Sequence, residues 1–146
     1  MDGRCPMFPN FALLFLLNTQ QEVLLLRRIN TPFCNGFYSL PGGAITLGET
    51  ARQAAMREGT NSLGIILSID DLECVHVMHR KCNDPEFFAC IFRPRSWQGV
   101  LNNLEPERHD DLRWFNLDKL PDNMVPAHRH ALEQIKHGIF YSEHGW

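Results

Sequence analysis

Short apolar runs alternate with polar breaks along the first third of the chain, and their length predicts buried strands. The runs FALLFLL (residues 11–17) and EVLLLRRI (residues 22–29) are separated by the polar residues 18–21. Continuous apolar runs of this size are typical of core strands, so we expect a hairpin of two buried strands. The next stretch, NTPFCNGFYSLPGG (residues 30–43), is dense in Asn, Pro and Gly and predicts a long irregular loop.

Beyond this loop the apolar period becomes helical. Ala51, Ala54, Ala55 and Glu58 recur at spacings of three and four, which predicts one face of a helix. The next four residues, GTNS (residues 59–62), are poor helix formers, about 2–3 kcal/mol worse in sum than strong formers. We therefore expect this helix to fray or end near Glu58.

Further strand-like runs and a second helix follow. The strand-like runs are LECVHVMHR (72–80), EFFACIFRP (86–94) and DLRWFNL (111–117). The stretch PAHRHALEQIKHGIF predicts a helix, with Pro126 near its start and Gly138 near its end. Strands and helices mix without regular alternation, so we expect a single α/β domain over residues 1–146.

Composition narrows the class of protein and its partners. The 146 residues are 44% hydrophobic and 21% charged, as in soluble globular proteins. A net charge of −3 gives no basic footprint, so we expect neither a nucleic-acid duplex nor a membrane as partner. Small anionic ligands stay open, because a pocket can be positive on an acidic protein. The cysteines form no C-x-x-C pair, which predicts reduced thiols in a cytoplasmic protein. They are Cys5, Cys34, Cys74, Cys82 and Cys90.

The segment GGAITLGETARQAAMREGTNSLGI, residues 42–65, carries the strongest chemical signal. Its residues at fixed offsets are Gly43, Glu49, Arg57, Glu58, Gly64 and Ile65. The segment resembles the Nudix box, whose pattern is Gly, five residues, Glu, seven residues, then Arg-Glu-aliphatic-x-Glu-Glu-x-Gly-aliphatic. The order of the predicted elements is also similar to that family. The resemblance therefore implies a Nudix-type α/β/α sandwich with a mixed β-sheet over nearly the whole chain.

The same resemblance implies a reaction and its cofactor. Nudix hydrolases (the MutT-like superfamily) split nucleoside diphosphate-linked compounds by attack of water on phosphorus, and Mg²⁺ or Mn²⁺ neutralises the phosphate charge. Glu58 would be a metal ligand or general base, and Arg57 would orient it. Gly42 and Gly43 would form the backbone turn near the phosphates. For Glu49 a solvated surface role is the open alternative. The expected partner is a small nucleotide or nucleoside diphosphate derivative, with a homodimer kept as an alternative state.

The box departs from the pattern at its second half. Gly59 stands for the aliphatic residue, and Asn61 and Ser62 replace two glutamates. Positions 58, 61 and 62 share one helix face, where three carboxylates would form a compact metal platform. We therefore expect weakened metal binding and turnover. The alternative is a nucleotide-binding Nudix module without catalysis.

Outside the box, a later loop offers replacement ligands. The loop LEPERHDD resembles a family region that often supplies one more carboxylate, so Glu105 is the first candidate metal ligand and Glu107 the second. A solvated acidic loop is the alternative interpretation.

Aromatic residues near the box are candidates for the substrate pocket. Phe37 and Tyr38 are expected to bind substrate by stacking on a base, with Phe33 and Trp97 as further candidates. Core packing is the alternative for each of them. The histidines of the last predicted helix, His128, His130 and His137, are expected on the surface.

Overall fold

A computed structural model describes residues 9–83 and 85–146 of the chain. The strands are β1 (Phe11–Leu14), β2 (Glu22–Arg28), β3 (Tyr38–Ser39), β4 (Gly42–Ala44), β5 (Leu72–Lys81), β6 (Glu86–Pro94), β7 (His109–Asn116) and β8 (Tyr141–His144). The helices are α1 (Ala51–Leu63), α2 (Pro126–Lys136) and the short 3₁₀ helix η1 (Ile69–Asp71). No helix in these two ranges is long and apolar enough to cross a membrane. Cys5 lies outside the described residues, whereas Cys34, Cys74, Cys82 and Cys90 are free thiols.

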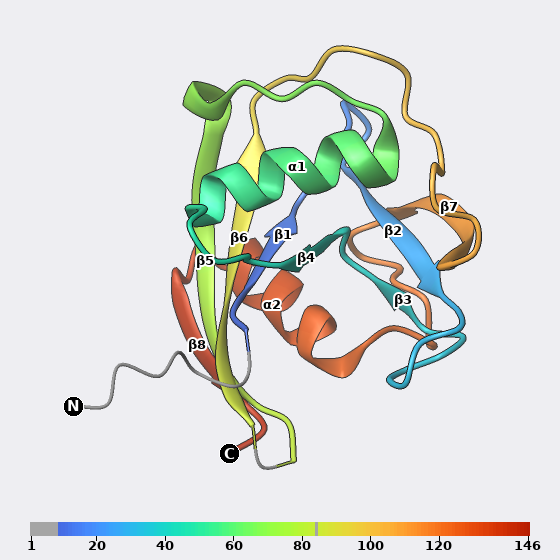
Figure 1. The fold of residues 1–146 in the computed structure, drawn as a ribbon. Coiled ribbons are helices and arrows are strands. Elements are labelled where there is room, and N and C mark those ends of the chain that lie inside the picture. The colour runs from blue at the N-terminus through green and yellow to red at the C-terminus, as the bar shows by residue number, and fades with distance from the viewer. Residues whose placement is uncertain (1–8, 84) are drawn as a thin grey trace.

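The strands form two sheets, and helices cover the larger one on both faces. Its order is β4-β1-β6-β5-β8, and it is mixed because β1 pairs in parallel with β6 and β5 with β8. The second sheet, β3-β2-β7, is antiparallel. Helix α1 contacts β1 and β4, while α2 contacts β5 and β8 from the other side (Figure 1). The α/β/α sandwich with a mixed sheet is confirmed.

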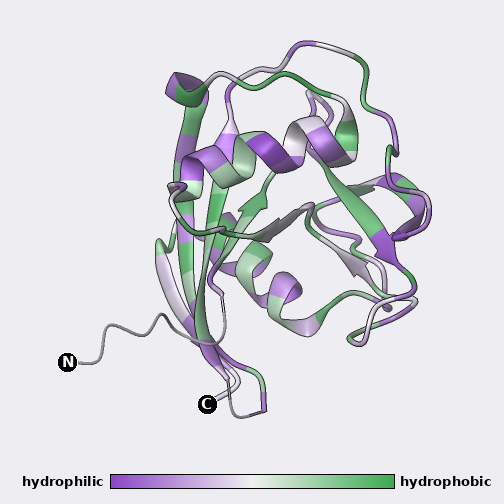
Figure 2. Ribbon diagram, in the orientation of Figure 1, coloured by the Kyte–Doolittle hydropathy of each residue, from purple (hydrophilic) through white to green (hydrophobic). Residues whose placement is uncertain are grey.

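The continuous apolar runs follow from this layering. Along β1, Ala12 and Leu14 pack into the core beside α1, whereas Leu13 packs into the core beside α2. Strand β2 alternates in the same way, with Leu24 on the first side and Leu25 on the second. A strand buried on both faces needs apolar residues at every position, which explains why neither run alternates with polar residues. Both strands are hydrophobic along most of their length in Figure 2.

The predicted hairpin forms only at its turn. Asn18 donates its backbone N–H to Glu22 O at 3.0 Å, and Leu17 forms an isolated antiparallel bridge with Val23. Beyond that bridge β1 and β2 separate into different sheets. The expectation of a simple two-stranded hairpin is therefore wrong, because each strand finds a longer partner elsewhere: β6 for β1 and β7 for β2.

Helix α1 has defined signals at both ends. Thr50 Oγ1 accepts the backbone N–H of Gln53 at 3.1 Å, and Gln53 Oε1 accepts that of Thr50 at 2.8 Å, which is a capping box. At the other end Gly64 has a φ of 69° and donates its N–H to the carbonyls of Gly59 and Thr60. The helix therefore ends at a glycine that adopts the left-handed conformation without strain.

The prediction that this helix frays near Glu58 is wrong. It stays regular through Leu63 because its last turn is buried. A Cβ atom at Gly59 would lie 2.8 Å from Leu67 Cδ1, so the glycine lets the following chain pack directly on the helix. Ser62 is also buried, with 3% of its surface exposed. Tertiary packing outweighs the low helix propensity of these residues.

Candidate active site

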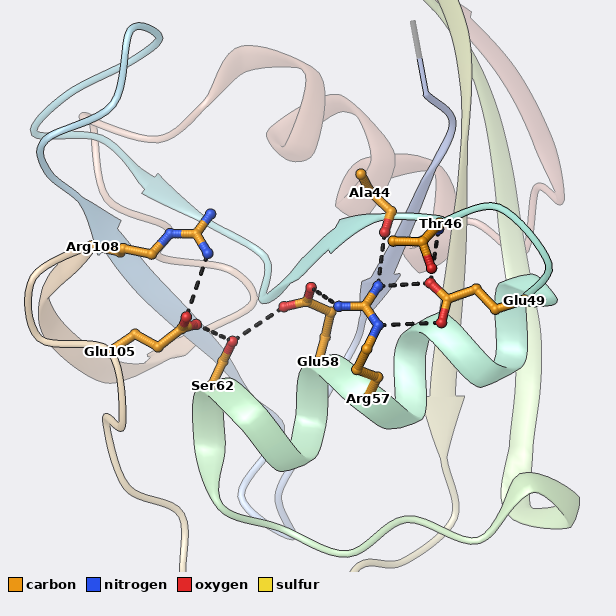
Figure 3. A network of polar contacts seen from close by, with 8 residues as sticks. All are labelled: Ala44, Thr46, Glu49, Arg57, Glu58, Ser62, Glu105 and Arg108. Atoms are coloured by element: carbon orange, nitrogen blue, oxygen red, sulfur yellow. Dashed lines mark hydrogen bonds and ion pairs between the residues drawn. The ribbon is translucent and has the colours of Figure 1, made fainter. Parts of the chain in front are cut away.

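Arg57, on α1, is held in place by hydrogen bonds to Glu49 and to the carbonyl of Ala44. We call this arrangement the Arg57 clamp. The Arg57 guanidinium donates to Glu49 Oε1 at 2.7 Å and to Ala44 O at 2.9 Å (Figure 3). Glu49 also accepts the backbone N–H of Thr46 at 2.8 Å. The Arg57 hydrogen bonds, and then that of Thr46, lower the pKa of Glu49 to about 2. The solvated role considered for Glu49 is thus wrong, because its carboxylate is bound to Arg57 and to the backbone of Thr46.

Glu58 projects from α1 toward the strand that carries Gly43. Its Oε1 accepts from Arg57 Nη1 at 2.8 Å, and its side chain is only 12% exposed. A Cβ atom at Gly43 would lie 2.3 Å from Glu58 Oε1, so only glycine leaves room for the carboxylate in this position. The first glycine of the box therefore has a steric reason, and the Glu58 carboxylate lies directly against β4.

Ser62 joins Glu58 to Glu105, which comes from the loop before β7. Ser62 Oγ lies 3.2 Å from Glu58 Oε2 and 2.5 Å from Glu105 Oε1. We call Glu58 and Glu105 the carboxylate pair. The single hydroxyl proton serves one carboxylate at a time, so the other anionic oxygen faces Ser62 Oγ without a proton between them. Arg108 lies 3.4 Å from Glu105 on the far side of the pair (Figure 3).

The carboxylate pair and Ser62 fit a hard divalent cation. Ligands of Mg²⁺ at 2.0–2.1 Å are separated from their neighbours by about 3 Å, close to the spacing of the three oxygens here. In the described part of the chain, no three His, Cys, Asp or Glu side chains gather as a complete metal site. Only two of the ligands are charged, so waters and phosphate oxygens would complete the coordination.

Glu107 and Asn61 lie apart from this arrangement. Glu107 is exposed, and among the described residues no hydrogen bond or ion pair joins its carboxylate to the carboxylate pair. Its backbone carbonyl instead accepts from Asn30 at 2.8 Å. Asn61 is exposed on α1 in a shallow groove that includes Arg57. Of the two predicted loop ligands, the structure thus brings Glu105 to Glu58 and leaves Glu107 at the surface.

A cleft of about 460 Å³ opens beside the carboxylate pair. Gly42 and Gly43, which were predicted to form the turn near the phosphates, line it together with Ala44 on the side of Glu58. Three arginines that the sequence did not single out also line the cleft: Arg28, Arg80 and Arg108. No aspartate or glutamate lies among the described residues that line it. The cleft is therefore cationic on a protein of net negative charge.

The aromatic residues predicted to bind substrate lie differently than expected. Tyr38 is 4% exposed and packs edge-on against Phe115 at 4.9 Å, while its hydroxyl donates to Asp111. Neither Tyr38 nor Phe37 lines the cleft, because β3 pairs with β2 and turns Tyr38 into the core. The aromatic residue of this loop that does line the cleft is Phe33, which is 39% exposed.

Trp97 packs at the core, which was the alternative to substrate binding for this residue. Its ring stacks near Trp114 at 6.5 Å, and it borders the core beside α1. The cleft-lining residues do not include it.

His128 is buried at the cleft, contrary to its predicted surface position. Its Nδ1 accepts the backbone N–H of Leu40 at 3.0 Å, and 6% of the residue is exposed. Burial, followed by the charges of Arg80 and Arg28, lowers its pKa to about 3, so the imidazole is neutral. The helical spacing of His128 with Ala131 and Leu132, which are also buried, was the signal that could have placed it inside.

Comparison with known proteins places the chain in a family. The NUDIX domain model matches residues 7–135. A putative 8-oxo-dGTP diphosphatase of Bacillus subtilis (strain 168) is 28% identical over 134 residues, which cover 90% of this chain and 83% of the relative. An ADP-ribose pyrophosphatase of Methanocaldococcus jannaschii is 33% identical over 118 residues, covering 81% of this chain and 68% of the relative.

The fold is also shared with a solved structure. The crystal structure of a MutT NUDIX hydrolase from Burkholderia pseudomallei superposes with a TM-score of 0.78 at 30% identity, covering 86% of this chain and 96% of that one. Fold, box and family model agree over most of the sequence. The chain therefore belongs to the Nudix hydrolase family.

Proposed function

We propose that this protein hydrolyses the pyrophosphate bond of a small nucleotide-linked compound in a reaction that depends on Mg²⁺ or Mn²⁺. One observation carries the proposal: the carboxylate pair meets at Ser62 Oγ, and its Glu58 lies against Gly43, which lines the arginine-containing cleft. Relatives named as a diphosphatase and a pyrophosphatase support the same class of reaction.

In this proposal the carboxylate pair binds the cation, and Arg57 positions Glu58. Glu58 Oε2 and Glu105 Oε1 would hold the cation, which supplies neutralisation of phosphate charge when bound. Glu58 Oε1 is already occupied by Arg57, so Oε2 is the atom that serves either as ligand or as acceptor of a proton from the attacking water. Arg57 is a positioning residue, since its clamp to Glu49 and Ala44 fixes the direction of Glu58.

Ser62 is the reason to expect weak turnover. It is buried and places a neutral oxygen between the two members of the carboxylate pair. A glutamate at this position would give the site one more negative charge for binding the cation. Arg57 and Arg108 flank the pair and reduce its net charge further. Metal affinity of the free protein should be low and should rise when substrate phosphates share the cation. For the same reason, a nucleotide-binding module without efficient turnover is the second candidate function.

A metal titration across a nucleotide panel tests the proposal. Wild type should release product only with Mg²⁺ or Mn²⁺, and Glu58→Gln and Glu105→Gln should each lower the rate by about 100-fold or more. Glu107→Gln is the matched control from the same loop and should keep the wild-type rate. Turnover that survives a chelator, or an equal loss in Glu107→Gln, contradicts the assignment. Thermal stabilisation by nucleotide without turnover would instead favour the binding module.

A further inference from the structure

Three arginines line the cleft, and they differ in whether a carboxylate lies close to them. Arg108 has a carboxylate neighbour, Glu105, at 3.4 Å. Arg28 has only neutral acceptors, the carbonyl of Phe33 at 3.1 Å and the hydroxyl of Thr31 at 3.4 Å. Among the described residues no carboxylate pairs with Arg28 or with Arg80.

Arg80 is the less satisfied of these two side chains. Its Nε is buried and has no hydrogen-bond partner in the part of the chain that the structure describes, and its guanidinium lies 5.0 Å from the ring centre of Phe87. Burial lowers the pKa of both Arg28 and Arg80, which reflects the cost of holding two cations out of water. The neighbouring Cys34 supplies no counter-charge, because burial raises the pKa of its thiol. Within residues 9–83 and 85–146, the two guanidinium groups thus have no anionic partner.

The strand register places Arg80 far from the carboxylate pair. Gly43 of β4, which lies against Glu58, pairs with Ala12 of β1. Ala12 pairs in turn with Cys90 of β6, and Cys90 with Val77 of β5, so these four residues lie side by side across the sheet. Arg80 lies three residues further along β5, which is about 10 Å along the strand, and it is three strands away across the sheet. One ligand phosphate group cannot contact both Glu58 and Arg80. A ligand anion at Arg80 would therefore be a second group, separate from the phosphate at Glu58.

We propose that Arg28 and Arg80 form a second anion subsite, so that the preferred substrate carries a phosphate monoester or similar anionic group remote from its scissile pyrophosphate. The inference rests on the proposed function, since it places the pyrophosphate end at Glu58. A neutral base alone would leave both half-buried cations uncompensated, whereas a phosphate dianion can accept from both guanidinium groups. Phe33 and Phe87, which also line the cleft, give the intervening part of the ligand an apolar surface.

Adenosine nucleotides without a pyrophosphate bond test the subsite by binding alone. Calorimetry would compare AMP with adenosine 2′,5′-bisphosphate and adenosine 3′,5′-bisphosphate, which each add one phosphate monoester. At least one bisphosphate should bind wild type about 10- to 100-fold more tightly than AMP, as charge-assisted hydrogen bonds would give. Arg80→Gln should remove most of this preference while leaving AMP binding unchanged, and Arg80→Lys, which keeps the charge, should retain part of it. Arg95→Gln, an exposed arginine outside the cleft, is the matched control.

The outcomes separate this inference from the proposed function. Equal binding of the three ligands, or equal weakening of all of them by Arg80→Gln, overturns the second subsite. Hydrolysis of NADH and dephospho-CoA, measured in parallel against NADPH and CoA, tests catalysis independently of the extra phosphate. Metal-dependent turnover of all four at similar kcat/KM would support the hydrolase and refute the subsite. A clear preference for bisphosphates without any turnover would support the subsite and refute the catalytic proposal.

Discussion

The buried His128 makes the stability of the fold depend on pH in a defined direction. Its pKa of about 3 in the folded protein compares with 6.5 for an unperturbed histidine. Below pH 6.5 the unfolded chain takes up a proton at this position while the folded protein does not. Stability is therefore complete above pH 6.5 and falls by about 1.4 kcal/mol per pH unit as the pH drops toward 3. Between pH 7 and pH 5 the loss from this one residue is about 2 kcal/mol.

Urea unfolding at pH 7 and pH 5 measures this loss, with His128→Leu beside wild type. The variant leaves the backbone N–H of Leu40 without its acceptor, which should cost about 1–3 kcal/mol at both pH values. The informative quantity is therefore the change between the two pH values, which should be smaller in His128→Leu by about 2 kcal/mol. His137→Leu, at the exposed end of the same helix, should behave as wild type. An identical change in wild type and His128→Leu would refute the reasoning.

Three further predictions concern the site itself. Gly43→Ala places a Cβ atom 2.3 Å from Glu58 Oε1 and should displace that carboxylate by about 1 Å, which lowers turnover about 100-fold with little change in Tm; an unchanged rate would show that Glu58 is not fixed there. Ser62→Glu adds a charged ligand and should tighten Mn²⁺ binding, measured by electron paramagnetic resonance, by about tenfold or more. Weaker or equal binding would mean that Ser62 is not the deficit. Glu49→Gln removes a carboxylate whose pKa is lowered from 4.5 to about 2. That lowering stabilises the fold above pH 4.5 and is lost toward pH 2, so thermal melts of wild type and Glu49→Gln should converge over this range and not run parallel.

Features set by local sequence were predictable. The box residues place Arg57 next to Glu58 on one helix, and a helix period is readable without the fold. The loop carboxylate Glu105 was singled out because it lies in a region that resembles the family, and the structure brings it to Ser62 and Glu58, while its role as a ligand stays a prediction. Its neighbour Glu107 was the second candidate, but it lies exposed at the surface. The loop conformation decides which of two nearby carboxylates turns inward, and the sequence alone does not give that conformation.

Features set by distant contacts were not predictable. The end of α1 depends on Leu67, which packs on Gly59 from beyond the helix. Tyr38 enters the core because β3 joins a sheet whose other edge comes from β7. Arg28 and Arg80 lie on strands of different sheets and meet only in the folded cleft. A single sequence gives no pairing information across such separations, so their common environment could be seen only in three dimensions.

The Arg57 clamp has a consequence for the entropy of ligand binding. It ties the connection between β4 and α1 at three points, through Ala44, Thr46 and Glu49, without any ligand. The conformational freedom of this segment is thus lost when the chain folds, and a ligand that arrives later does not have to order it. A substitution at Ser62 can change the charge of the site without loosening this frame. Ligand affinity and loop order are therefore separable properties in this protein, and either can change by single substitutions while the other is retained.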